Sequence, residues 1–184
     1  MGIHDLNGRT ALVTGASRGI GAAICAAIAR AGADVIGVSS SLPEGGGEVG
    51  ASVRAAGLRF DAVSCDLGDR NAIRAMLDGL GDRTVDILVN NAGIIRRAPA
   101  AEHSDADWDA VMAVNLDAPF LLTRELGRGM LARGYGKVIF VASVHSFQGG
   151  VTVPGYAATK GAIAQLTKAF ANEWAARGVN VNAI

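Results

Sequence analysis

The segment Thr10-Ala-Leu-Val-Thr-Gly-Ala-Ser-Arg-Gly-Ile-Gly21 decides the fold of this 184-residue chain. Its apolar start, Thr10 to Val13, predicts a buried strand, and Ile20, Ile24 and Ile28 recur at helical spacing after the glycine-rich turn. A strand, such a turn and a helix form a binding site for a dinucleotide, because the glycines admit the pyrophosphate and the helix N-terminus offers free N–H groups. The alternative is a tight turn that binds no ligand.

The rest of the chain alternates between predicted strands and helices. We expect strands at 34–38, 58–63, 85–90, 138–142 and 179–184, and helices at 71–80, from 105 onward and at 153–177. Residues 42–50 are glycine-rich and predict a loop before a weak helix. Such alternation requires βαβ crossovers. The predicted fold is therefore an α/β, doubly wound parallel sheet of the Rossmann type with helices on both faces, in one domain of residues 1–184.

Composition excludes several classes of partner. The formal net charge is zero and no segment is rich in Lys or Arg, so we expect no nucleic acid and no membrane as partner. No apolar run approaches the length of a membrane span. Residues 1–9 lack the apolar core of a secretory signal, and Cys25 and Cys65 lie in apolar surroundings without a Cys-x-x-Cys pattern. These features predict a reduced, cytoplasmic protein.

A second group of polar residues lies around the fifth predicted strand. Tyr156 and Lys160 are four residues apart on a predicted helix and therefore lie on one face. A phenol has a pKa near 10, and a neighbouring ammonium group favours the phenolate, which makes Tyr156 a usable acid–base group. Ser143 follows the strand and is expected at the carboxyl end of the sheet, where open α/β folds bind ligands. The alternative is a core tyrosine beside a solvated lysine.

The expected cofactor is NAD or NADP. An acid that binds the ribose of NAD is expected after the second strand, but Ser39-Ser40-Ser41 stands there, and Arg18 is placed to meet a 2′-phosphate instead. Asp66 is expected either to contact adenine or to cap the next helix, a role for which Asp69 competes. The expected cofactor contacts are Gly15, Ser17, Arg18, Gly19, Ile20, Gly21, Ser39, Asp66, Leu67, Asn91, Ala92 and Gly93, to which the family resemblance described below adds Tyr156 and Lys160.

A carboxylate-binding pair is predicted beside the cofactor. Arg96 and Arg97 follow the Asn91-Ala92-Gly93 loop, and a guanidinium group binds a carboxylate through two hydrogen bonds. The alternative is a solvated surface pair. His145 and Gln148 follow Ser143 and are expected to bond hydroxyl groups of the substrate or to face solvent. The candidate substrate contacts are Arg96, Arg97, Ser143, His145, Gln148 and Tyr156.

Residues 102–115 carry two further polar features. The potential metal ligands among them are Glu102, His103, Asp105 and Asp107. We interpret them as the start of a helix that Ser104 caps, because acids are favoured at a helix N-terminus, and we expect no metal. Asn115 is a polar residue within an apolar stretch, and a buried amide needs partners. It is expected to bond the backbone or to hold a water molecule in a proton path.

Taken together, these motifs resemble those of the short-chain dehydrogenase/reductase family. The resemblance covers essentially the whole chain and rests on Thr14–Gly21, Asn90–Gly93, Asn115, Ser143 and Tyr156-x-x-x-Lys160. It implies an NAD(P)-dependent oxidoreductase in which Tyr156 exchanges the substrate proton and Ser143 holds the carbonyl or alcohol oxygen. It also implies that Lys160 binds the nicotinamide ribose and lowers the tyrosine pKa, and that Asn115 supports a water relay.

Shorter matches point to a subgroup of that family. Residues 90–97, 146–150, 153–154 and 171–174 resemble the dehydrogenases of 2-deoxy-D-gluconate and 2-dehydro-3-deoxy-D-gluconate. This implies a deoxy-keto sugar acid as substrate, generally with NAD, and a homo-oligomer, dimer or tetramer, in the full-length form. Family members normally continue past Ile184 into a substrate lid and a final strand, so we expect a sheet truncated after its sixth strand. The alternatives are a 3-oxoacyl-carrier-protein reductase and an inactive, truncated nucleotide-binding protein.

Overall fold

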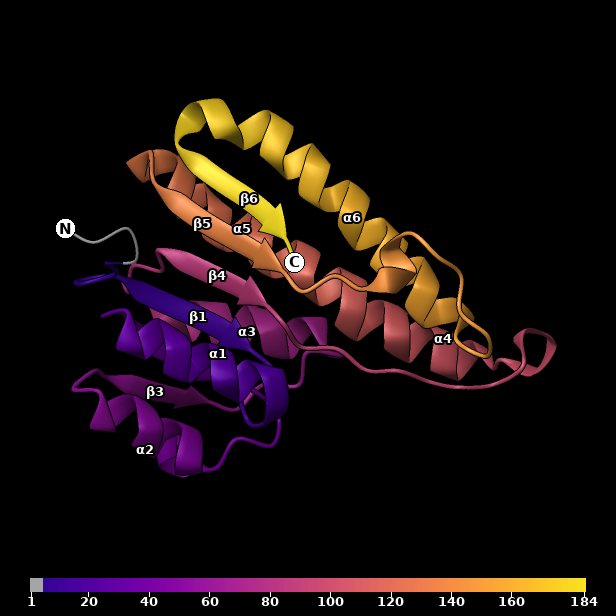
Figure 1. Cartoon of the computed structure of the whole chain (residues 1–184), viewed down its shortest axis with the longest axis horizontal. Helices are drawn as coiled ribbons and strands as arrows, with labels where there is room; N and C mark the ends of the chain where they lie inside the picture. The colour runs from indigo at the N-terminus through magenta and orange to yellow at the C-terminus, as the bar shows by residue number, and fades with distance from the viewer. Residues whose placement is uncertain (1–4) are drawn as a thin grey trace.

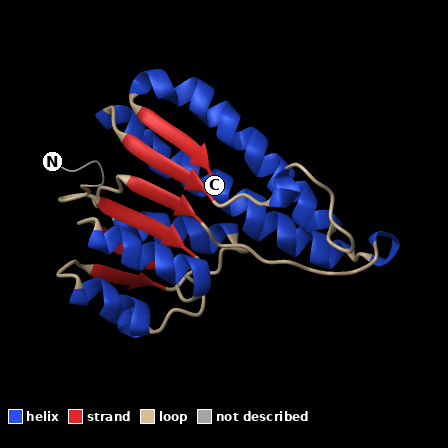
Figure 2. Ribbon diagram, in the orientation of Figure 1, coloured by secondary structure: helices blue, strands red, loops and turns tan. Residues whose placement is uncertain are grey.

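The computed structural model describes residues 5–184; the first four residues, part of the N-terminus expected to lack a signal, lie outside the described chain. Six parallel strands form one sheet in the order β3-β2-β1-β4-β5-β6 (Figures 1 and 2). The strands are β1 (Thr10–Thr14), β2 (Asp34–Val38), β3 (Phe60–Val63), β4 (Ile87–Asn90), β5 (Gly136–Phe140) and β6 (Val179–Ala183). This arrangement confirms the predicted parallel α/β fold of the Rossmann type.

Helices cover both faces of the sheet. The helices are α1 (Gly19–Arg30), α2 (Gly47–Ala55), α3 (Arg70–Leu80), α4 (Asp105–Met112), α5 (Ala118–Arg133) and α6 (Pro154–Trp174). Successive strand side chains point to opposite faces, so Ala11 and Val13 pack with α1 and α2, whereas Leu12 packs with α3, α5 and α6. Helix α6 extends past the carboxyl ends of the strands, beside α4 (Figure 1). Within residues 5–184, no helix combines the length and apolar character needed to cross a membrane.

Several predicted boundaries were wrong: β3 and β4 each begin two residues later than expected, and α6 ends at Trp174 instead of at 177. Three further differences affect the path of the chain. Helix α2 begins at Gly47, inside the expected loop, because left-handed backbone at Gly45 and Gly46 turns the chain into it. Strand β5 covers Gly136–Phe140 instead of 138–142, because its register with β4 ends where Asn90 faces Phe140. The long helix that Ser104 caps is interrupted by a π-helical turn at Ala113–Asp117. The change at β5 matters most for function, since Ser143 lies in a loop beyond the strand end.

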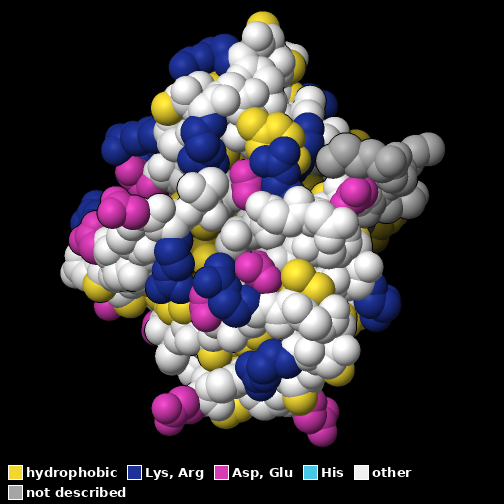
Figure 3. Space-filling view, turned by 90° about the vertical axis from the view of Figure 1, so that its left-hand side faces the viewer, with side chains coloured by type: hydrophobic (Ala, Val, Ile, Leu, Met, Phe, Trp, Pro, Cys, Tyr) yellow, Lys and Arg dark blue, Asp and Glu magenta, His cyan; other side chains and the backbone are white. Residues whose placement is uncertain are grey.

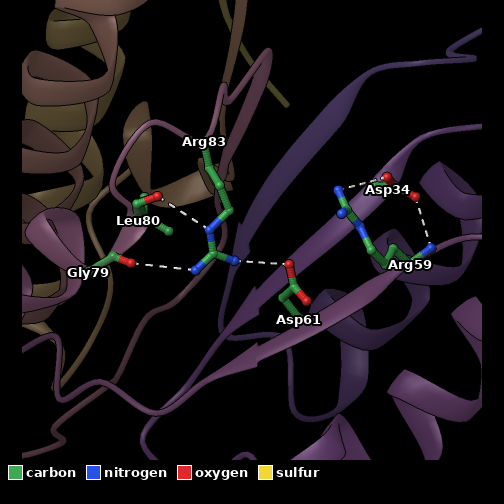
Figure 4. Close-up of polar contacts among 6 residues, drawn as sticks. All are labelled: Asp34, Arg59, Asp61, Gly79, Leu80 and Arg83. Carbon is green, nitrogen blue, oxygen red and sulfur yellow. Dashed lines mark hydrogen bonds and ion pairs between the residues drawn. The ribbon is translucent and has the colours of Figure 1, made fainter.

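The amino-terminal edge of the sheet carries paired charges. Arg83 donates to Asp61 at 3.0 Å and also to carbonyl oxygens at the end of α3, and Arg59 pairs with Asp34 at 3.2 Å (Figure 4). On this side of the molecule, basic and acidic side chains are interspersed (Figure 3). Exposed pairs of this kind contribute about 0–1 kcal/mol each. We therefore assign them a minor role in stability; they lie at the opposite end of the strands from the cavities described below.

Gly127 allows α5 and α6 to pack closely on the face of the sheet that α3 also covers. A Cβ atom at Gly127 would lie 2.5 and 2.8 Å from two ring carbons of Trp174, which is 5% exposed. By contrast, a Cβ atom at Gly79 in α3 would meet no atom within 4 Å. The two glycines therefore separate steric cost from helix propensity.

We predict opposite effects of alanine at these two positions. Gly127→Ala should lower the free energy of unfolding by about 1–3 kcal/mol, because the overpacked indole must shift. Gly79→Ala should raise it by about 0.5–1 kcal/mol, because alanine favours the helix. Urea denaturation followed by circular dichroism measures both. A stabilised Gly127→Ala variant would show that the close approach to Trp174 is wrong.

Candidate active site

Two adjoining cavities open at the carboxyl ends of the strands, where β1 and β4 lie side by side. Strand order reverses at this point, which is where open α/β sheets bind ligands. The glycine-turn cavity, of about 430 Å³, is lined by the turn after β1, residues 39–41 and residues 65–67. The tyrosine cavity, of about 480 Å³, is lined by residues that follow β4 and β5 and by the start of α6. Both cavities share the lining residues Ile20, Asn91, Gly93 and Ile94.

The turn after β1 leaves room and donors for an anion. Gly15 has φ +67°, and a Cβ atom at Gly21 would collide with the carbonyl oxygen of Gly15. A Cβ atom at Gly19 would meet nothing within 4 Å. No side chain caps the first turn of α1, whose N-cap residue is Arg18. The uncapped N–H groups and the open glycine surface fit a dinucleotide pyrophosphate.

A cluster of hydroxyl groups forms one corner of the glycine-turn cavity. The Oγ atom of Ser17 lies 3.2 Å from those of both Ser39 and Ser41, which are 3.3 Å from each other. Arg18 lines the same cavity. Hydroxyl groups rotate to donate or accept, so this corner can hold either a ribose hydroxyl or a phosphate.

Asp66 carries the sole carboxylate among the described residues that line the glycine-turn cavity. Its Oδ1 atom accepts a hydrogen bond from the N–H of Gly68 at 2.8 Å. The cap of α3 is instead Asp69, which accepts from the N–H of Asn71 at 2.7 Å. The capping role considered for Asp66 therefore belongs to Asp69, and Asp66 faces the cavity.

Ser143, Tyr156 and Lys160 all line the tyrosine cavity. Lys160 is 6% exposed; its Nζ atom donates to the carbonyl oxygen of Val141 at 2.6 Å and lies 5.6 Å from the centre of the Tyr156 ring. Burial lowers the pKa of Lys160 because the charged form loses solvation. The Oγ atom of Ser143 accepts from the N–H of His145 at 3.2 Å. These side chains place a phenol, a hydroxyl and a buried ammonium group around one space.

Asn115 anchors the loop after β4. The residue is 2% exposed and lies in the π-helical turn. Its Oδ1 accepts from the N–H of Ile94 and its Nδ2 donates to the carbonyl oxygen of Ile94, both at 2.8 Å, with Thr159 Oγ1 at 3.4 Å. Backbone bonding, one of the two expected roles, is thus present in the structure, and the water relay stays a prediction.

The structure separates the candidate substrate residues into two groups. Arg97 and His145 line the tyrosine cavity, whereas Arg96 and Gln148 are not among its lining residues. Arg96 instead pairs with Asp107 of α4, with Nε and Oδ1 3.3 Å apart. Gln148 is exposed, and its carbonyl oxygen lies 3.3 Å from Nδ1 of His145. Of the two arginines, only Arg97 is placed to meet a ligand in this cavity.

Thr14 and Ser146 also shape the site, although sequence reasoning assigned no contact to either side chain. Thr14 Oγ1 accepts from the N–H groups of Asn91 and Ala92, each at 3.0 Å, and donates to the carbonyl oxygen of Val89. Ser146 Oγ donates to the carbonyl oxygen of Lys160 at 2.8 Å. A signal was available for Thr14, because it is a polar residue at the end of an apolar strand. Nothing local marked Ser146.

The acidic segment before α4 shows the expected cap. Ser104 Oγ accepts from the N–H of Asp107 at 3.1 Å. Both ring nitrogens of His103 are buried without a hydrogen-bond partner. Within residues 5–184, no three His, Cys, Asp or Glu side chains converge as a metal site would require.

The chain is similar to known proteins over nearly its whole length. The sequence profile of the short chain dehydrogenase family matches residues 9–184. A 2-dehydro-3-deoxy-D-gluconate 5-dehydrogenase of Pseudoalteromonas atlantica is 56% identical, over 98% of this chain and 72% of that protein. Its namesake in Bacillus subtilis is 49% identical, over 99% of this chain and 72% of that protein. A crystal structure of a gluconate 5-dehydrogenase from Burkholderia cenocepacia, in complex with NADP and tartrate, superposes with a TM-score of 0.89 at 39% identity, over 98% of this chain and 71% of that one.

Proposed function

This chain belongs to the short-chain dehydrogenase family, and from that premise we propose that it transfers a hydride between NADP or NAD and a carbinol carbon of a deoxy-keto sugar acid. The observation that carries the proposal is the placement of Ser143, Tyr156 and Lys160 around a cavity that adjoins the glycine-turn cavity. The similarity to sugar-acid dehydrogenases favours this substrate class over a 3-oxoacyl-carrier-protein reductase or an inactive nucleotide-binding protein. Residues 1–184 act as one dinucleotide-binding and catalytic domain in this proposal.

The proposed mechanism assigns one task to each side chain. The bound nicotinamide cofactor supplies or accepts the hydride. The Tyr156 hydroxyl donates a proton to the carbonyl oxygen during reduction and receives it back during alcohol oxidation. Ser143 Oγ holds that oxygen by a hydrogen bond. The Lys160 ammonium group, 5.6 Å from the tyrosine ring centre, stabilises the phenolate and so lowers the barrier to proton transfer.

Tyr156→Phe tests this assignment. The change removes the hydroxyl and keeps the ring, so we expect kcat to fall by about 10²–10⁴-fold, the range for loss of an acid–base group. Cofactor affinity should stay near that of the parent protein, as measured by fluorescence titration. Turnover within a few-fold of the parent value would remove Tyr156 from the proton-transfer step.

Arg97 is the proposed partner of the substrate carboxylate. It lines the tyrosine cavity, and no ion pair is recorded for it within residues 5–184. Arg96 carries the same charge but is held by Asp107. A sugar acid needs a placed cation, because a charged hydrogen bond is stronger than a neutral one.

Arg97→Ala and Arg96→Ala form a matched pair that tests this role. Arg97→Ala should raise KM for a sugar acid by an amount equivalent to about 1.5–3 kcal/mol, with cofactor binding spared. Arg96→Ala should leave KM near the parent value. Steady-state kinetics with a sugar acid and with its uncharged analogue measure both effects. Equal KM values in the two variants would contradict the assignment. Equal turnover of the sugar acid and of its uncharged analogue by the parent protein would also contradict it.

We further propose that the cofactor corner prefers NADP. It contains Arg18 and three hydroxyl groups, and residues 39–41 offer no carboxylate to a ribose. The relative from Burkholderia cenocepacia was crystallised with NADP. A 2′-phosphate gains both hydrogen bonds and charge pairing in this corner.

Titration of both cofactors tests the preference. Arg18→Ala should lower the affinity for NADP by about tenfold, as expected for loss of a charged hydrogen bond, and should change the affinity for NAD little. Arg30→Ala, in the last turn of the same helix, serves as the control. Equal losses for the two cofactors would make Arg18 a general phosphate contact.

We also propose a homo-oligomer in the full-length form, with α5 and α6 as the contact surface. A groove of about 430 Å³ beside them is lined by five apolar residues and two polar ones, namely Leu116, Phe120, Ala162, Leu166 and Ala169 with Asp117 and Gln165. Phe120 is 37% exposed and stacks on Phe170. Such an apolar helix-pair face suits a second copy, dimer or tetramer. Sedimentation velocity of the full-length form should show a dimer or larger for the parent and a smaller species for Phe120→Arg. A monomeric full-length parent would contradict the proposal.

We propose a cytoplasmic location as well. Cys25 and Cys65 are free and buried, and burial raises the pKa of the Cys25 thiol to about 12. Unpaired thiols suit a reducing compartment. Recovery of the protein outside the cytoplasmic fraction of its source cells would contradict this.

A further inference from the structure

Two connecting segments supply residues to the tyrosine cavity: residues 91–99 after β4, and residues 141–153 after β5, which include a 3₁₀ turn at Val144–Ser146. The N–H of Ala98 donates to the carbonyl oxygen of Thr152 at 3.0 Å and joins the two segments. Thr152 has φ 64°, and within residues 5–184 it is the one residue other than glycine with a positive φ. The link between the segments thus falls at the one position where a non-glycine residue adopts a left-handed backbone.

This conformation is unfavourable for threonine. A β-branched side chain crowds the backbone in the left-handed region, so the surrounding structure must hold it there. The hydroxyl of Thr152 donates to the carbonyl oxygen of Val151 at 2.6 Å, which supports the turn. The turn also redirects the chain from Val151, which is 89% exposed, to Val153, which is 1% exposed. Helix α6 begins at the next residue and carries Tyr156 in its first turn.

We propose that Thr152 is a positioning residue: its left-handed turn fastens the loop of Arg97 to the start of α6. Arg97 precedes Ala98, whose N–H is held, and Tyr156 lies four residues after Thr152. We call the hydrogen bond from the Ala98 N–H to the Thr152 carbonyl oxygen the latch. It fixes the side chain proposed to bind the carboxylate relative to the side chain proposed to transfer the proton. The kinetic part of this inference rests on the proposed sugar-acid activity, whereas the latch itself does not.

Paired proline and glycine substitutions separate the latch from general stability. Thr152→Pro fixes φ near −65° and forbids the turn, whereas Thr152→Gly accepts it. Ala98→Pro removes the N–H donor at a site that already precedes Pro99 and is therefore extended, whereas Ala98→Gly keeps the donor. None of the four substitutions alters the side chain of Arg97 or Tyr156. Each proline also restricts the backbone of the residue before it, Arg97 or Val151, so the kinetics are read together with hydrogen exchange at Ala98.

Both proline variants should raise KM for the sugar acid by about tenfold, because each removes the hydrogen bond between Ala98 and Thr152. Their kcat and NADP affinity should stay near the parent values, and both glycine variants should match the parent. Hydrogen-exchange mass spectrometry of residues 94–99 should show a protected Ala98 amide in the parent and in Thr152→Gly, and an unprotected one in Thr152→Pro. An unchanged KM in Ala98→Pro would overturn the proposal.

Hydrogen exchange in the parent protein tests whether the Ala98–Thr152 hydrogen bond exists even if the proline variants do not fold. An Ala98 amide that exchanges in the parent as fast as in an unfolded peptide would show that the latch does not exist. Failure of the parent to turn over any sugar acid would count against the proposed function, while the exchange result would still test the latch.

Discussion

The structure depends on the hydrogen bonds that Thr14 makes where β1 and β4 meet. Its hydroxyl oxygen accepts from the N–H groups of Asn91 and Ala92, and the Asn91 side chain returns a bond to the carbonyl oxygen of Thr14 at 2.9 Å. Strand order reverses at this junction, and these bonds join the loop after β4 to the end of β1. These hydrogen bonds therefore position Asn91, which lines both cavities. A buried hydroxyl that satisfies backbone groups in this way is costly to lose, because its partners would be left unpaired.

Local patterns predicted most of the fold, and long-range contacts decided the rest. The strand, turn and helix between Thr10 and Arg30 follow from apolar spacing and glycine alone. The end of β5 could not be predicted, because it depends on the register with β4. The π-helical turn was equally invisible, since Asn115 bonds Ile94 from another segment. A pattern in one segment carries no information about the partner that another segment supplies.

The same division applies to the candidate site. Tyr156 and Lys160 lie four residues apart on one helix, so their common cavity was predictable from spacing. The sequence treated Arg96 and Arg97 as equivalent, and the structure distinguishes them only because Asp107 of α4 lies beside Arg96. Helix α4 reaches that position through its packing on α6, which no local pattern reports. Residues placed by one helix were therefore predicted better than residues placed between segments.

The burial of Lys160 has a consequence for attempts to make this protein more heat-resistant. Its side chain is buried, and its ammonium group donates to the backbone carbonyl oxygen of Val141 and forms no ion pair with a carboxylate of the described residues. An uncharged side chain of similar length would avoid the loss of solvation. A library selected for survival at high temperature would therefore tend to replace this lysine and, under the proposed mechanism, enrich clones that fold but do not turn over substrate. Selection for stability in this scaffold needs a simultaneous screen for turnover.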